Sequence, residues 1–313
     1  MNAHYSGDDL DIDLMCVLYQ TFEQKLSVVP VAAPPEITSR GRVFALQGLE
    51  TPLNVWLLRY PRGEVNGALR TFHALQALQE VMFPAAPRVF YFNWAQWNGE
   101  ALLMLEYHPE GRFADGHPLA LFARTGPDFA TTLARLHQIP WSTLPELPCV
   151  SPSDVLRTLR KHIEALRAPR LRELYRRLWE WESEIQEQPY SLVHGHYTLE
   201  HIVALQTHVI AIYGWEQAAL GDARLDFGYT CAYLSAHRLQ MVEVFADAYI
   251  RNAGPVQDAR FWNALGGLRL LVELSEKLRV AALRQDAAAQ QALHEQWHNV
   301  YTFTISQAGI ALP

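Results

Sequence analysis

The sequence has few cysteines, no long apolar run and no excess of positive charge, and each absence excludes a class of protein. Its three cysteines are scattered over 313 residues without metal-site spacing, so we expect buried thiols in a reducing cytoplasm. No apolar run approaches the ~18 residues that a membrane span requires. The formal net charge of −7 argues against general nucleic-acid binding. We therefore expect a cytoplasmic protein with neither a nucleic-acid nor a membrane partner.

The spacing of apolar residues predicts two lobes of different character. Residues 1–35 are predicted to form a short amphipathic helix, over 10–26, and a proline-rich linker. Residues 36–107 follow the order strand, strand, helix, strand, strand, at 42–46, 54–60, 66–82, 88–94 and 101–107. Residues 108–313 are mostly helical in pattern, at 118–137, 153–187, 241–252 and 258–305. The sequence therefore predicts an α+β fold with a small antiparallel β N-lobe and a larger, mainly helical C-lobe.

One segment, residues 191–229, concentrates the side chains that can carry chemistry. Its pattern predicts a strand, a turn at His194-Gly195, a hairpin over 202–213 and then a helix. Two further histidines, His196 and His201, crowd the same turn. Three carboxylates follow downstream, at Glu216, Asp222 and Asp226.

This segment resembles the core of the aminoglycoside phosphotransferase and choline kinase-like family. That family shows V-H-G-D-x-x-x-x-N, an apolar hairpin, I-D-W-E and G-D-P-x-x-D-L-A. The chain keeps Val193-His194-Gly195, Trp215-Glu216, Gly221-Asp222 and Asp226-Phe227-Gly228. Residues 103–107 with Gly111 resemble the family's hinge strand, and 133–137 its L-A-x-L-H helix end. The resemblance spans residues 37–235 and implies a protein-kinase-like fold, with ATP- and Mg²⁺-dependent phosphate transfer to a small-molecule hydroxyl.

The residues that perform this chemistry in the family are replaced here. In kinase-type transfer an Asp accepts the hydroxyl proton, an Asn and a second Asp hold Mg²⁺, and a strand Lys braced by a helix Glu grips the phosphates. By the resemblance, His196 stands at the catalytic Asp, His201 at the Asn, Gly214 at the second Asp and Arg59 at the Lys. The helix over 66–79 holds no acidic residue that could brace Arg59.

The resemblance implies roles for the remaining site residues. Arg59, Gly41 (the one glycine left of the glycine-rich loop) and the hinge residues Glu106 and Tyr107 would contact a nucleotide. His194 and Asp226 would support the loop, and Asp222 would cap the following helix. Mg²⁺ prefers oxygen ligands, so Glu216 with only His201 beside it would hold the ion weakly.

These replacements favour a catalytically impaired pseudokinase that binds a small ligand or a protein partner. Two alternatives stay open. The chain could be an active ATP-dependent small-molecule kinase with a remodelled metal site, in which His196 is the general base. Or His196, His201 and Glu216 could form a site for Zn²⁺, Mn²⁺ or Fe²⁺.

A basic stretch between Arg157 and Arg177 stands out in this acidic chain. Its eight cations face only two carboxylates, Glu164 and Glu173, within the stretch. Such a run could bind an anionic partner, or it could form the solvated side of a helix pair.

Overall fold

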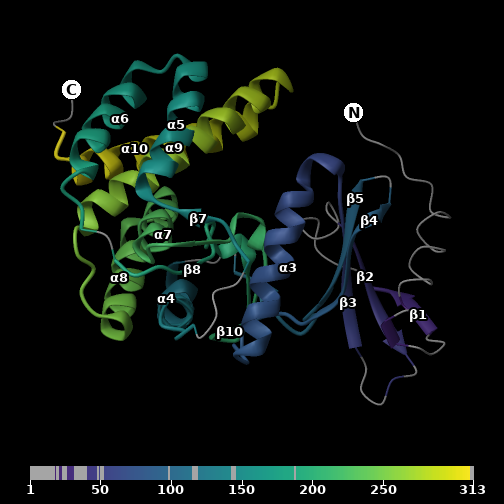
Figure 1. Ribbon diagram of the computed structural model, residues 1–313. Helices are drawn as coiled ribbons and strands as arrows, with labels where there is room; N and C mark the ends of the chain where they lie inside the picture. Colours follow the sequence, from purple (N-terminus) through teal and green to yellow (C-terminus); the bar gives the residue numbers. More distant parts are fainter. Residues whose placement is uncertain are drawn as a thin grey trace.

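Two lobes form the protein, as the computed structural model in Figure 1 shows. A β-sheet and one helix make the smaller lobe, and helices make most of the larger one. The structure describes residues 18, 21–22, 27–31, 41–47, 49, 53–97, 99–114, 119–141, 146–186 and 188–310. The predicted helix over 10–26 falls largely outside these ranges.

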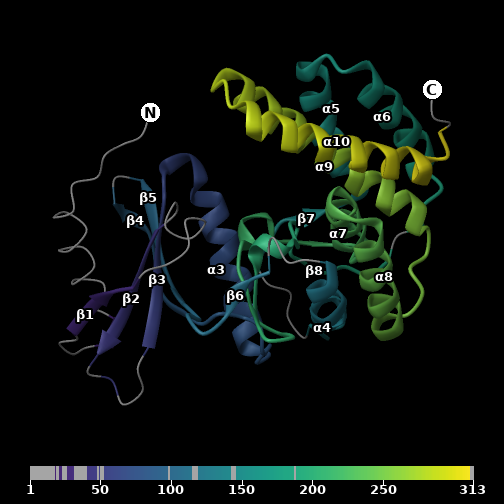
Figure 2. The same ribbon diagram turned by 180° about the vertical axis from the view of Figure 1, so that it is seen from behind.

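The N-lobe is a five-stranded antiparallel sheet in the order β1-β2-β3-β5-β4. The strands are β1 (Ser27–Pro30), β2 (Gly41–Gln47), β3 (Leu53–Tyr60), β4 (Val89–Trp97) and β5 (Glu100–Glu106). A short 3₁₀ turn, η1 (Arg62–Glu64), leads into α3 (Val65–Glu80), which lies between the sheet and the C-lobe in both views (Figures 1 and 2).

The two faces of this sheet contribute to different cores. Strand side chains alternate, so Trp56, Leu58 and Tyr60 face α3 and join the main core that continues into the C-lobe. Val55 and Leu57 point the other way, into a smaller cluster that contains Leu18 and no α3 residue. The direction in which a β3 side chain points therefore decides whether it can reach the interlobe region.

The C-lobe packs helices around short strands. Its helices are α4 (Leu119–His137), α5 (Pro152–Leu166), α6 (Pro169–Glu182), α7 (Arg224–His237), α8 (Leu239–Ala253), α9 (Ala259–Leu283) and α10 (Ala287–Ala308). Its strands are β6 (Arg112–Phe113), β7 (Cys149–Val150), β8 (Ser191–Val193), β9 (Ile202–Leu205), β10 (His208–Ile212) and β11 (Ala219–Gly221). Two 3₁₀ turns, η2 (Leu199–His201) and η3 (Trp215–Gln217), flank the β9–β10 hairpin.

Most elements match the prediction, with three corrections. The helical pattern over 258–305 is divided between α9 and α10. The segment assigned to the linker contributes the strand β1. The strand lies at the edge of the sheet, a position that tolerates its terminal Pro30. The helical pattern over 153–187 is two helices, since Arg167 adopts a left-handed conformation at the end of α5 and Pro169 starts α6. Ser151 and Asp154 form a capping box that fixes the start of α5.

The cysteines and the helices bear on two expectations drawn from composition. Cys231 is buried as expected, but Cys149 is exposed in β7, and Cys16 lies outside the described residues. Over the described ranges, no helix has the length and apolar character needed to cross a membrane.

Candidate functional site

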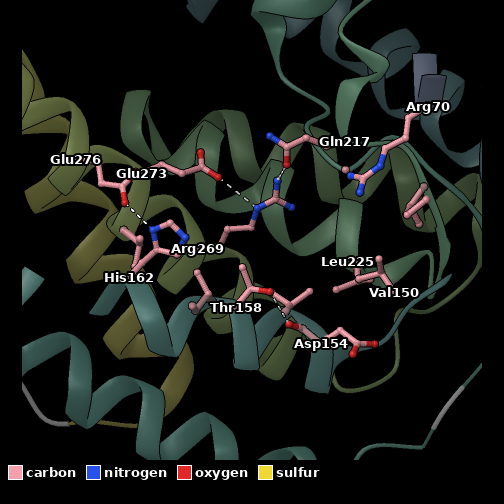
Figure 3. Close-up of a pocket in the computed structure, with 16 residues that line it drawn as sticks. Arg70, Val150, Asp154, Thr158, His162, Gln217, Leu225, Arg269, Glu273 and Glu276 are labelled. Atoms are coloured by element: carbon pink, nitrogen blue, oxygen red, sulfur yellow. Dashed lines mark hydrogen bonds and ion pairs between the residues drawn. The ribbon is translucent and has the colours of Figure 1, made fainter. Parts of the chain in front are cut away.

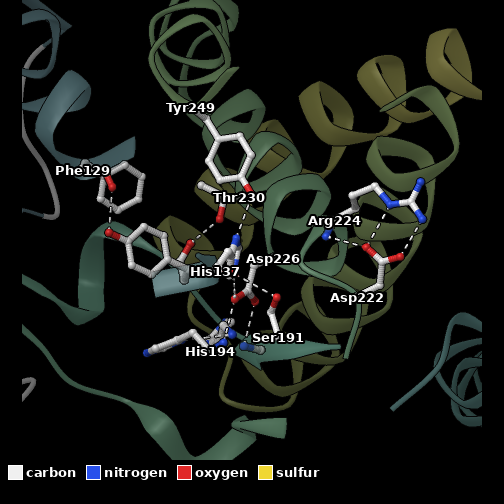
Figure 4. Close-up of polar contacts among 12 residues, drawn as sticks. Phe129, His137, Ser191, His194, Asp222, Arg224, Asp226, Thr230 and Tyr249 are labelled. Carbon is white, nitrogen blue, oxygen red and sulfur yellow. Dashed lines mark hydrogen bonds and ion pairs between the residues drawn. The ribbon is translucent and has the colours of Figure 1, made fainter. Parts of the chain in front are cut away.

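Asp226 anchors the loop that carries the three histidines (Figure 4). Its buried carboxylate accepts the Gly195 N–H at 2.8 Å and the His194 N–H at 2.6 Å. His137, at the end of α4, donates from Nε2 to the same carboxylate at 3.2 Å. Burial alone would raise the pKa of Asp226, but these hydrogen bonds and the neighbouring His137 hold it below its ordinary value. Asp226 is therefore an ionised support for the loop.

His194 is held as one neutral tautomer. Its Nε2–H donates to the carbonyl oxygen of Tyr213 at 2.8 Å, while its Nδ1 accepts the N–H of His196 at 3.2 Å. Complete burial, followed by the nearby His201, lowers the pKa of His194 to about 4. Both ring nitrogens are thus committed to backbone groups of the site.

The ring of His196 lies between two other rings. Its centroid is 4.9 Å from that of His201 and 5.2 Å from that of Tyr229. Burial, then the neighbouring His201 and Arg269, lowers the pKa of His196 far below its ordinary value. A general base must accept a proton near neutral pH, so this imidazole is poorly suited to the role.

His201 and Gly214 occupy complementary space. Gly214 has φ +76°, and a Cβ built on it would lie 2.3 Å from Cδ2 of His201. The His201 Nδ1 lies 3.0 Å from the carbonyl oxygen of His196 and 3.2 Å from the Thr198 hydroxyl, so the ring is held in this place. A side chain at position 214 has no room beside His201, and the two replacements act as a coupled pair.

Glu216 is directed toward the N-lobe. Its Oε1 accepts the Tyr60 hydroxyl at 3.1 Å, and Gly67 of α3 packs against its side chain. Among the residues that the structure describes, no group of three or more His, Cys, Asp or Glu side chains is placed to hold a metal ion. The predicted set of His196, His201 and Glu216 is therefore not gathered as a ligand site.

Arg59 points away from the cleft, which corrects its predicted role. It lies opposite Leu102 in the β3–β5 register, and Leu102 belongs to the cluster on the sheet face away from α3. There its Nε donates to the carboxylate of Glu100. Gly41 is likewise part of a strand, paired with Leu58 of β3. Arg59 is therefore not placed to grip phosphate between the lobes, whereas the nucleotide contact of Gly41 stays a prediction.

The hinge is closed by the chain's own groups. The Tyr213 hydroxyl donates to the carbonyl oxygen of Glu106 at 2.9 Å, and the Tyr107 N–H donates to the carbonyl oxygen of Asn54 at 2.9 Å. The buried rings of Tyr213 and Trp56 meet edge to face at 5.5 Å. The Glu106 carboxylate forms a two-pronged ion pair with Arg88, at 2.9 and 3.0 Å. Of the hinge residues predicted to meet a nucleotide, Glu106 thus uses its carbonyl oxygen and Tyr107 its N–H within the chain.

Asp222 has a structural partner. Arg224 forks onto its carboxylate with Nε at 2.9 Å and Nη2 at 2.6 Å, and both side chains are buried (Figure 4). The pair also ties the start of α7 to the 183–190 connection, through Arg224 Nη2 and the carbonyl oxygen of Gln186 at 2.6 Å. This arrangement uses Asp222 for loop support.

The basic stretch lies on α5 and α6, and part of its charge is matched locally. Arg160 pairs with Glu164 and Arg176 with Glu180, one turn along their own helices. These pairs are exposed and contribute little to stability. Docking of an anionic partner there stays a prediction.

A cavity of about 490 Å³ opens beneath the histidine loop (Figure 3). Its floor comes from α5, one side from α9, and its roof from Gly195, Gln217 and Arg70 of α3. Its charged lining residues are Arg70, Asp154, Arg269, Glu273 and Glu276, with His162 beside Glu276. The volume falls in the ~300–1,000 Å³ range of small-molecule pockets.

The fold and this loop architecture agree with the comparison to known proteins. The sequence model of the phosphotransferase enzyme family matches residues 39–265, which is more than half of the chain. The chain therefore belongs to this family. No curated protein matches its sequence significantly.

Solved structures of family members share the fold at low sequence identity. Choline kinase LicA from Streptococcus pneumoniae superposes with TM-score 0.65 at 11% identity, over 96% of this chain and 100% of that one. The GDP complex of aminoglycoside 2'-phosphotransferase-IIIa gives 0.62 at 17%, over 94% and 99%. Macrolide 2'-phosphotransferase MphH from Brachybacterium faecium gives 0.56 at 17%, over 91% and 97%.

Sequence reasoning missed the residues that close the hinge and line the cavity. Tyr213 directly precedes Gly214, which by the resemblance stands at the family's metal-binding Asp. A bulky aromatic residue next to that position was the sequence feature that could have pointed to Tyr213. Trp56 could have been found from the alternation of β3, which places it on the same face as Tyr60. Arg70 carried no signal beyond its place on a helix.

Proposed function

We propose that this member of the phosphotransferase enzyme family has lost phosphate transfer and works as a small-molecule-binding protein. The carrying observation is the closed hinge, where the Tyr213 hydroxyl bonds the Glu106 carbonyl oxygen and its ring is buried against Trp56. A nucleotide base would have to displace both aromatic side chains. Such a displacement would expose large apolar surface, which costs about 1.5–3 kcal/mol for each fully buried aromatic.

The loop chemistry supports the same proposal. Phosphate transfer relies on metal ions that neutralise developing charge and on a positioned group that accepts the hydroxyl proton. Here His196 is held neutral, and His201 fills the space that a carboxylate at position 214 would need. Restoring one catalytic group therefore leaves the others missing.

The cavity supplies what a binding protein needs. It is concave, it is largely apolar with a few polar groups, and it opens on the loop and not on the closed hinge. Its walls come from helices and from a loop fixed by Asp226, so a ligand would meet a preformed site.

The test is a phosphate-transfer and hydrolysis assay on the full chain with ATP or GTP and with Mg²⁺ or Mn²⁺. We expect no turnover above the buffer rate, in wild type and in Glu216→Ala alike. Turnover near the ~1–100 s⁻¹ of ordinary kinases would contradict the proposal. Loss of such turnover in Glu216→Ala would instead support an active enzyme with a remodelled metal site.

A further inference from the structure

In the cavity beneath the histidine loop, the acidic and the basic side chains differ in whether they have hydrogen-bond or ion-pair partners. This inference rests on the proposed function, because it concerns the ligand that the cavity would take. Each acidic side chain of the lining has its own partners, whereas one cation has none within the described part of the chain. The chemistry of the ligand follows from that imbalance.

The acidic side chains are occupied. Glu273 accepts from Tyr229 at 2.7 Å and from Arg269 Nε at 3.2 Å. Glu276 accepts from His162 Nδ1 at 2.7 Å. Asp154 accepts from the Ser151 hydroxyl at 2.6 Å and from its N–H at 3.0 Å, which lower the pKa of Asp154. A cationic ligand would find no carboxylate that lacks a donor.

Arg70 is the exception. Its guanidinium lines the cavity and forms no hydrogen bond or ion pair with any other described residue. It stands on α3 above the loop and points toward the cavity, on the side of Leu225 and Val150 (Figure 3). A guanidinium with five unused N–H groups suits a planar, two-oxygen acceptor.

Two more donors stand on the same wall. Arg269 uses Nε for Glu273 and Nη2 for the Gln217 side-chain oxygen, and none of these contacts uses its Nη1. The amide nitrogen of Gln217 is likewise free to donate while its oxygen accepts. Figure 3 shows Gln217 between Arg269 and Arg70. Three donor groups thus follow one another along this wall of the cavity.

Apart from Thr158, whose hydroxyl donates to the carbonyl oxygen of Asp154, most of the remaining lining is apolar. Aliphatic side chains from five elements form this part: Val150, Val155, Leu159, Val193, Leu225 and Val272. Such a wall stabilises a hydrocarbon or aromatic body by about 25 cal/mol for each Å² that leaves water.

We infer that the cavity binds a small organic monocarboxylate, with the carboxylate on Arg70 and the Gln217–Arg269 pair and an apolar body against the aliphatic wall. The fork of Arg70 matches both carboxylate oxygens, and such charge-assisted pairs are the stronger class of hydrogen bond. The ligand is thus an anion, although the chain as a whole is acidic.

The experiment is calorimetry and thermal shift on the full chain with a panel of aromatic and aliphatic monocarboxylates. Each acid is matched with the primary amide and the amine of the same skeleton. Arg70→Met is the test variant, because Arg70 has no polar partner among the described residues whose loss would disturb the fold. Lys161→Met is the matched control, since Lys161 is exposed on α5 outside the cavity lining.

We expect some carboxylates to bind and to raise the melting temperature, while their amides and amines do not. Arg70→Met should weaken that binding at least about tenfold, as loss of a charge-assisted pair does, and Lys161→Met should leave it unchanged. Binding of amines or amides in preference to acids, binding of no acid, or equal affinity in Arg70→Met would each overturn the inference. Phosphate transfer measured on the same protein separates the two ideas: turnover defeats the proposed function and leaves the ligand class standing.

Discussion

The Tyr213 hydroxyl donates a 2.9 Å hydrogen bond to the backbone carbonyl oxygen of Glu106, and so joins the histidine-loop hairpin to the hinge between the lobes. The same residue receives the His194 Nε2–H on its own carbonyl oxygen at 2.8 Å. Tyr213 therefore connects His194 to the hinge, through its carbonyl oxygen at one end and its side-chain hydroxyl at the other. Because its ring also packs on Trp56, the connection is buried and shielded from water.

Removing only this hydroxyl tests its contribution. Tyr213→Phe keeps the ring but leaves the buried Glu106 carbonyl without that donor, so we expect the free energy of unfolding to fall by about 1–3 kcal/mol. Urea denaturation measures the change. Tyr301→Phe is the control, because that hydroxyl makes no hydrogen bond to any residue that the structure describes, and it should stay within about 0.5 kcal/mol. Equal stability of the two variants would show that the Tyr213 contact is unimportant.

The steric coupling of Gly214 and His201 predicts a rescue. Gly214→Ala should destabilise the protein by at least about 2 kcal/mol, from its left-handed backbone and from the overlap with the His201 ring. His201→Ala should recover part of that loss in the double variant, and a double-mutant cycle measures the coupling. Gly63→Ala, where an added Cβ meets nothing within 4 Å, should be nearly neutral. Purely additive losses would refute the shared-space account.

The buried histidines predict a loss of stability in mild acid. The folded protein lowers the pKa of His194 from 6.5 to about 4, so between these pH values the unfolded chain binds a proton that the folded chain does not. Stability is complete above pH 6.5 and falls as the pH drops toward 4, by about 3 kcal/mol for this residue. The lowered pKa of His196 acts in the same direction.

Urea denaturation between pH 7.5 and 4.5 measures this slope. His194→Gln should reduce the slope of the unfolding free energy against pH by up to about 1.4 kcal/mol per pH unit, which corresponds to one proton. The substitution His294→Gln, at an exposed histidine, should leave that slope unchanged. A stability that is constant from pH 7 to 5 would mean that His194 is not held neutral.

The fold was predictable because its signals are local. The short apolar run at 54–60 predicts a strand, the 3.6-residue spacing at 66–82 predicts a helix, and the structure places β3 and α3 there. The break between α5 and α6 was missed because Arg167 gives no sign of a left-handed conformation, although Pro169 marked a helix start.

The site was only partly predictable, since it depends on which way side chains point. A shift of one residue along a strand reverses its face, and the motif alone put Arg59 in the cleft, whereas Trp56, Leu58 and Tyr60 face it. The cavity joins α3, α5 and α9, which lie far apart in sequence. Arg70 could not be assigned to it without the tertiary structure.

Asp226 should be among the most sensitive polar positions. The two carboxylate oxygens of Asp226 accept N–H groups of the loop and of His137. Asp226→Asn replaces one of these oxygens by an NH₂ group, so that two buried donors would face each other. We expect a loss of about 3 kcal/mol or more in urea denaturation. Asp258→Asn, at a partly exposed carboxylate 3.7 Å from Arg224, should cost less than about 1 kcal/mol. A small effect at Asp226 would contradict its role as loop anchor.

Nucleotide binding tests the central claim most directly. Titration calorimetry of the full chain with ATP and with GTP, in the presence of Mg²⁺ or Mn²⁺, reports whether the hinge can accept a base. Closure by Tyr213 and Trp56 predicts no saturable heat at millimolar nucleotide in wild type. Saturable binding with a micromolar Kd, in a protein whose Tyr213–Glu106 contact is intact, would contradict the account.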